Sequence, residues 1–145
     1  MKPDINTALL NAAQEIINRF SPLIEDEYEK SRLGSWGALI LISALKFNDA
    51  SSSLKKENHD IIEWLKEHST ISMKEFDKFK ILDDKTIDNY DQDNQSLRKM
   101  LDKQFEAIQE KGDKILLKEG IDLMRSMHQR RKVSDLIGML QQQEG

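Results

Sequence analysis

Thirteen consecutive residues without a charge, Leu33 to Leu45, interrupt a chain in which 33% of the residues are charged. A helix needs about 20 apolar residues to cross a bilayer, so this stretch is too short to be a membrane span. Its apolar side chains cover nearly the whole circumference of a helix, leaving a narrow polar edge near Ser35 and Lys46. Such a helix is expected to be buried on most sides. Either other helices of the same chain surround it, or a second chain covers it.

The residue types favour an all-α fold. Val133 is the only valine, whereas Leu, Lys, Glu, Gln, Ala and Met, which favour helices, dominate the sequence. The chain has only six glycines and two prolines, so its helices are expected to be long. A chain of 145 residues matches the usual size of one domain. We therefore expect a single domain over residues 1–145, a bundle of five or six mostly antiparallel helices.

The first helix is predicted over residues 5–32. Its apolar residues recur at spacings of three and four, and the stripe keeps its direction across Ser21-Pro22. The four residues from Phe20 to Ile24 turn a helix by about 400°, which brings the stripe almost back onto itself. This pattern favours one helix kinked near Pro22. In the alternative, Ser21 caps a new helix with Pro22 at its first position.

Local signals predict the boundaries in the middle of the chain. A flexible entry at 33–35 and a polar loop at 48–53 are expected on either side of the apolar helix, and an amphipathic helix follows the loop. Ser72 and Glu75 form an S-x-x-E capping box, which predicts a short helix that begins at Met73.

The last third of the chain begins with an acidic connector over residues 81–96, because Asp and Asn favour caps and turns over helix interiors. A long helix is predicted from about Asn94. Gly112 and Gly120 lie on its apolar stripe, and they mark either a break or a close helix crossing. A last short helix over 133–140 and a frayed tail over 141–145 are expected to end the chain.

The sequence contains no motif that carries known chemistry. Without cysteine, a disulfide, a thiolate nucleophile or a Cys-type zinc site is impossible. Lys56, Leu65 and Arg125 stand three residues before the histidines, so the Glu-x-x-His motif of di-iron bundles is absent. The run from Asp91 to Asp102 resembles a calcium loop, but Ser96 stands where the loop needs Gly, so a turn is predicted. We expect no catalytic residue, metal or cofactor, although the sequence does not exclude an enzyme.

A basic segment near the C-terminus is one candidate binding site for anions or nucleic acid. In the alternative, its charges interact with a helix C-terminus or balance the acidic connector. A net charge of −4 and the lack of interleaved aromatic residues favour the second interpretation. The members of this candidate anion patch are Arg125, His128, Arg130, Arg131 and Lys132.

The apolar helix is the second candidate site, as a protein interface. Its small residues allow another helix to approach closely, and a twofold homodimer is the simplest arrangement. The members of this candidate interface are Trp36, Gly37, Ile40, Leu41, Ala44 and Phe47.

We expect from these patterns a non-enzymatic protein that binds other proteins or itself through a helical surface, as accessory, inhibitory, chaperone-like or immunity factors do. One alternative is a nucleic-acid or anion-binding accessory protein that uses residues 125–132. A second alternative is a helical module with an apolar pocket for a small ligand, lined by Trp36, Trp64 and methionines. The absence of a membrane-length apolar run and the acidic Asp4 near the N-terminus predict a cytoplasmic protein.

Overall fold

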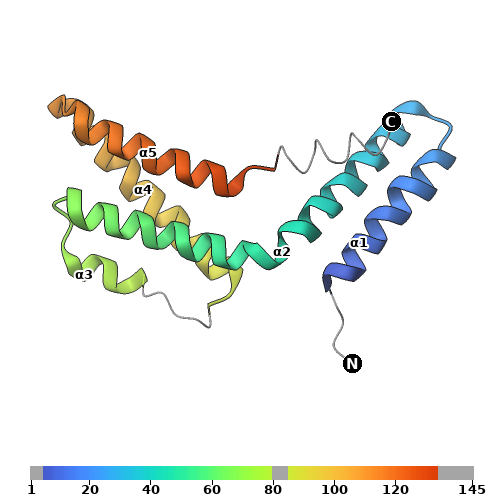
Figure 1. Ribbon diagram of the computed structural model, residues 1–145, viewed down its shortest axis with the longest axis horizontal. Helices are drawn as coiled ribbons and strands as arrows, with labels where there is room; N and C mark the ends of the chain where they lie inside the picture. The colour runs from blue at the N-terminus through green and yellow to red at the C-terminus, as the bar shows by residue number, and fades with distance from the viewer. Residues whose placement is uncertain (1–4, 80–84, 134–145) are drawn as a thin grey trace. The chain divides into compact units, whose positions relative to one another are not determined.

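The computed structural model describes residues 5–79 and 85–133, which form five α-helices and, in the described part, no strand (Figure 1). The prediction of an all-α fold with five or six helices is confirmed. The described residues fall into two compact units, one made of 5–49 with 132–133 and the other of 50–131. The single domain expected over 1–145 stays a prediction.

The chain breaks near Pro22 instead of bending. Helix α1 spans Ile5–Glu15, a π-helical turn spans Ile16–Phe20, and a 3-10 turn spans Ser21–Leu23. Ile24 is extended, with ψ 123°, so one kinked helix over 5–32 is wrong. Proline has no N–H for a helical hydrogen bond. The alternative prediction was a new helix that begins at Ser21-Pro22. In the structure only the 3-10 turn begins there.

Helix α2 spans Glu27–His68, and Asp26 caps it by accepting a hydrogen bond from the Glu29 N–H at 2.9 Å. The predicted flexible entry at 33–35 and polar loop at 48–53 are both wrong, because α2 is continuous through them. Serine costs well under 1 kcal/mol in a helix interior. At the entry, the Ser35 hydroxyl also finds an acceptor inside the helix, the Ser31 carbonyl, at 2.9 Å.

The first unit contains a helical hairpin, in which α1 and the first part of α2 lie side by side (Figure 1). The Ser21 hydroxyl donates to the Lys30 carbonyl at 3.0 Å and links the two arms next to the break. At Gly37 the two arms approach each other closely. A Cβ atom there would lie 2.6 Å from Cγ1 of Ile17 and 2.9 Å from Cγ2 of Ile16.

The second unit contains the rest of α2, helix α3 over Met73–Phe76 and a 3-10 turn over Asp77–Phe79. The predicted start at Met73 is confirmed. The predicted capping box does not form, because the Ser72 side chain makes no cap bond. The Glu75 N–H instead donates to the Ser72 backbone carbonyl at 2.9 Å.

Helix α4 spans Ile87–Lys111, so the predicted acidic connector is wrong from residue 87 onward, and residues 80–84 lie outside the described part. Thr86 caps the helix by accepting from the Asn89 N–H at 3.2 Å. Tyr90 and Asn94 are buried, so the side of α4 that faces the interior of the unit holds the helix in place. The calcium-loop-like run of Asp91 to Asp102 is helix interior and not the turn that we predicted.

Helix α5 spans Lys114–Arg131 and follows α4 through a single left-handed residue, Gly112, with φ 70°. The Gly112 N–H donates to the Gln109 carbonyl at 3.1 Å and the Asp113 N–H to the Ile108 carbonyl at 3.3 Å, a Schellman motif. Both interpretations of the glycines are therefore realised, because Gly112 forms the break and Gly120 packs against Phe105. The predicted last helix, apart from Val133, and the tail at 141–145 lie outside the described residues.

One apolar cluster holds the second unit together, with contributions from α2, α3, the 3-10 turn, α4 and α5. Trp64 and Phe105 pack at its edge, with ring centroids 5.6 Å apart. The buried members are Ile61, Ile62, Leu65, Phe76, Phe79, Leu97, Leu101 and Met127.

Candidate interaction surface

The first part of α2 has a packed inner side and an exposed outer side. Gly37 and Ala44 are buried on the inner side, and the close approach at Gly37 brings α2 against Ile16 and Ile17. At 3.6 residues per turn, Trp36 and Leu39 point away from this side. The exposed fraction is 56% for Trp36 and 54% for Leu39.

The exposed apolar side chains continue along the helix in both directions. Tyr28, one turn before Arg32, is 72% exposed, and Phe47 is 39% exposed. We call this surface the outer face of α2 and define it by one set of side chains: Tyr28, Glu29, Arg32, Trp36, Leu39, Ser43, Lys46 and Phe47.

The outer face combines an apolar centre with a shallow groove. Tyr28, Arg32, Trp36 and Leu39 line this groove together with two serines, and its volume is about 390 Å³. A fully covered aromatic side chain buries about 150–250 Å². At the observed exposed fractions, Tyr28, Trp36 and Leu39 together leave roughly 400 Å² of apolar surface in water. A patch of this size is often functional.

The six residues of the candidate interface differ in their exposure to solvent. Gly37 and Ala44 are buried and Ile40 and Leu41 are half-buried, whereas Trp36 and Phe47 are exposed. Sequence reasoning missed Tyr28 because the uncharged stretch begins after Arg32, and it did not include Leu39 among the six residues of the candidate interface. The spacing of three and four residues that continues from Leu39 back to Tyr28 was the signal that could have found them.

The residues of the candidate anion patch make ion pairs and contacts with several different residues. The Arg130 guanidinium pairs with the Asp60 carboxylate, and Arg131 lies 2.8 Å from the Glu57 carboxylate. Arg125 pairs with Asp122 at 3.0 Å on the exposed side of α5, where His128 is also exposed. Lys132 also makes an interaction in the structure. Two of the cations are thus bound to carboxylates of α2, and anion binding by this segment stays a prediction.

The most buried charge among the described residues belongs to Glu57, whose residue is 2% exposed. Its carboxylate accepts hydrogen bonds from Asn94 at 2.9 Å, from Arg98 at 3.2 Å and from both Nε and Nη2 of Arg131, at 3.0 and 2.8 Å. These bonds join α2, α4 and α5. Asn58 completes the group by donating to the Tyr90 carbonyl at 2.9 Å and accepting from Asn94 at 2.8 Å.

Burial on its own raises the pKa of the Glu57 carboxyl, but this effect is outweighed. The hydrogen bonds from Arg131 and Asn94, with the charges of Arg131 and Arg98, hold the pKa below its ordinary value. The same contacts raise the pKa of the Arg131 guanidinium. Glu57 is therefore charged at neutral pH, and the group holds the C-terminal end of α5 against α2 and α4.

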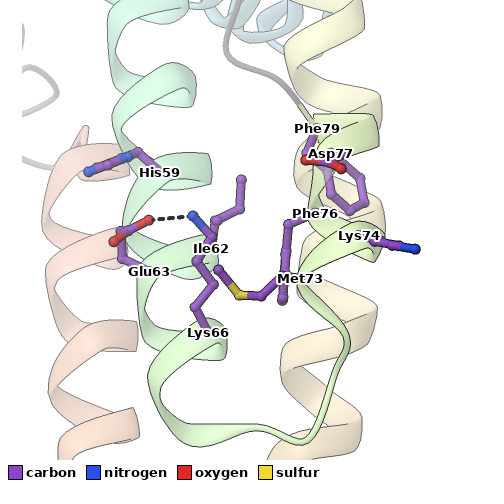
Figure 2. Close-up of a pocket in the computed structure, with 9 residues that line it drawn as sticks. All are labelled: His59, Ile62, Glu63, Lys66, Met73, Lys74, Phe76, Asp77 and Phe79. Carbon is purple, nitrogen blue, oxygen red and sulfur yellow. Dashed lines mark hydrogen bonds and ion pairs between the residues drawn. The ribbon is translucent and has the colours of Figure 1, made fainter.

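A second hollow lies between α2 and α3, with a volume of about 460 Å³ (Figure 2). Ile62 and Phe76 supply apolar surface, and Met73 projects from α3 toward Ile62. Glu63 and Lys66 lie on the α2 side and pair with each other at 3.0 Å. Trp36 and Trp64, which we expected to line an apolar pocket, are not among its residues.

The described residues contain no group of three or more His, Asp or Glu side chains arranged to hold a metal ion. None of their helices is both long enough and apolar enough to cross a membrane.

No protein-family model matches the chain, and neither a curated protein nor a solved structure is significantly similar to it.

Proposed function

We propose that this protein is a non-enzymatic interaction protein that binds a protein partner through the outer face of α2. The exposure of Trp36 carries the proposal. A tryptophan side chain that is more than half exposed, beside Leu39 and Tyr28 at helical spacing, loses the favourable free energy of burial unless a partner covers it.

The free energy available from covering the outer face is consistent with a protein as the partner. Covering roughly 400 Å² of apolar surface at about 25 cal/mol per Å² gives about 10 kcal/mol before the costs of association. Those costs are about 4–15 kcal/mol. The apolar centre would therefore need additional contacts from the charged residues at its ends, as in interfaces with an apolar core and a polar rim.

The two alternatives have less support. Nucleic-acid or anion binding by residues 125–132 requires free cations, and Arg130 and Arg131 are engaged by Asp60 and Glu57. Binding of an apolar small molecule requires an enclosed apolar cavity. The hollow between α2 and α3 is open and carries charged side chains of both signs.

A capture experiment with two matched variants tests the proposal. Tagged wild type, Leu39→Asp and Ile115→Asp would be incubated with lysate of the source cells to which a differently tagged copy of the chain has been added. Ile115 is 77% exposed on α5 and serves as the control for a new surface charge. Circular dichroism would verify that both variants fold.

We expect wild type and Ile115→Asp to recover the same protein or the second copy, and Leu39→Asp to lose it. Equal recovery by all three proteins, or recovery of nothing above the background, would contradict the proposal.

A further inference from the structure

The eight residues of the outer face of α2 lie within one sector of about 100° around the helix, so helical geometry alone makes the steps between them the same in both directions. From Tyr28 to Phe47 these steps are one, three, four, three, four, three and one, so a twofold axis can pair each member with another member. The central steps of three and four are those of helices that pack in pairs. Along the sequence, the midpoint of the face falls between Gly37 and Ala38. On the exposed side of the helix, Trp36 and Leu39 lie on either side of this midpoint.

We propose that the outer face binds the same face of a second copy of this chain, with the two α2 helices antiparallel about a twofold axis at this midpoint. The inference rests on the proposed function and names its partner. In this arrangement Trp36 packs against Leu39 of the second copy and Leu39 against its Trp36. Four large apolar side chains then cover one another at the centre.

The charges at the two ends of the face match this direction. Reversal about the midpoint places Glu29, which lies 3.7 Å from Arg32 in its own copy, opposite Lys46 of the second copy, and the twofold axis repeats the pair. A parallel arrangement would instead place Glu29 against Glu29 and Lys46 against Lys46. Like charges in contact repel, so the antiparallel direction is favoured.

The same twofold axis also gives compatible pairs for the remaining residues of the outer face. Tyr28 meets Phe47, which extends the apolar contact at both ends. Arg32 meets Ser43, whose small side chain leaves room for the longer one. The Ser43 hydroxyl already donates to the Leu39 carbonyl at 2.9 Å, so its burial leaves no unpaired donor.

The area agrees with a reversible dimer. Adding Phe47 and the polar side chains to the apolar centre gives roughly 600 Å² for each copy, or about 1,200 Å² in total, at the lower end of specific protein interfaces. The face of each copy extends over 19 residue steps, from Tyr28 to Phe47, which is about 29 Å of helix.

Light scattering combined with size-exclusion chromatography tests the inference. Wild type would be measured from about 1 to 100 μM, together with Leu39→Asp, Glu29→Lys, Lys46→Glu and the double variant. Glu106→Lys, an equal change of charge at an exposed position of α4, is the control. We expect wild type and Glu106→Lys to form dimers and Leu39→Asp to be a folded monomer.

The charge variants report the direction of pairing. Each single reversal creates two repulsive pairs in the dimer, so we expect the dissociation constant to rise about tenfold. The double variant restores opposite charges and is expected to return within about threefold of wild type. Failure of the double variant to recover would overturn the antiparallel pairing.

A wild type that stays monomeric at about 100 μM would overturn the second copy as the partner. A dimer that Leu39→Asp leaves intact would overturn it as well. Failure of the proposed function is seen separately, in the lysate experiment, when Leu39→Asp captures the same proteins as wild type or when wild type captures nothing above the background.

Discussion

Replacing Gly120 with alanine tests whether the α4–α5 crossing is as close as the structure shows. A Cβ atom at this position would lie 2.0 Å from Cε1 and 2.7 Å from Cζ of Phe105. Carbon atoms in contact prefer about 3.5–4.0 Å, so the ring would have to move by about 1.5 Å. The ring also packs against Trp64, with centroids 5.6 Å apart, and would lose part of that contact.

Two opposing contributions set the magnitude. Alanine is favoured over glycine in a helix interior by about 1 kcal/mol. Inserting a methyl group into a packed core costs about 1–3 kcal/mol. Because the overlap with Phe105 is severe, we expect Gly120→Ala to lower the free energy of unfolding by about 1–2 kcal/mol.

Urea unfolding followed by circular dichroism measures this change, and a second background isolates its cause. In Phe105→Ala the obstructing ring is absent, so adding Gly120→Ala should instead raise the free energy of unfolding by up to about 1 kcal/mol. The sign should therefore differ between the two backgrounds. A stabilising Gly120→Ala in the wild-type background, or the same destabilisation in both, would refute the close crossing.

Three further changes test the second unit by the same unfolding measurement. Glu57→Gln should cost about 2 kcal/mol at neutral pH, because it removes a charge that Arg131 and Asn94 bind. The folded-state pKa of Glu57 lies below its ordinary value, so the stabilisation that this carboxylate gives is fully present above the ordinary value and is lost as the pH falls through the lower folded value. Wild type should therefore lose more stability on acidification than Glu57→Gln, and parallel pH profiles would contradict this. Thr86→Ala should cost about 1 kcal/mol through the lost cap of α4, and an unchanged midpoint would refute the cap. Gly112→Ala should cost about 1–2 kcal/mol because φ is 70° there, although its Cβ would meet no atom within 4 Å, and a neutral result would contradict the left-handed turn.

The predictions from sequence succeeded where local chemistry decides the structure. The helix-forming composition predicted the all-α fold, and the S-x-x-E pattern located the start of α3 at Met73, although the Ser72 side chain makes no cap bond there. Gly112 was predicted as a possible break because glycine is costly in a helix interior, and the left-handed turn is there.

The predictions failed where Asp, Asn and Ser take part in a helix. These residues favour turns when they are considered alone, but Asn94 is 1% exposed and fixes α4 through its bonds to Glu57 and Asn58. The residues of this group come from three helices, and Asn94 lies 37 positions from both Glu57 and Arg131. A local pattern contains no information on such distant pairs, so neither the buried group nor the pairing of Arg131 was predictable.

The candidate surface was predictable in position but not in composition. The uncharged stretch identified the correct helix, and helical spacing could have added Tyr28. Which side of α2 faces α1 depends on the break near Pro22, which turns the chain back on itself. The division between buried Gly37 and exposed Trp36 therefore required the structure.

The turn at Gly112 also has a consequence for the order of folding. It joins α4 and α5 through hydrogen bonds between residues no more than five positions apart, and Asp113 then caps α5 by accepting from the Leu116 N–H at 3.0 Å. Contacts between neighbours in sequence form fast, because little chain entropy is lost in closing them. We expect residues 87–131 to pair as a hairpin early, and Glu57 to join Arg131 only in a later and slower step.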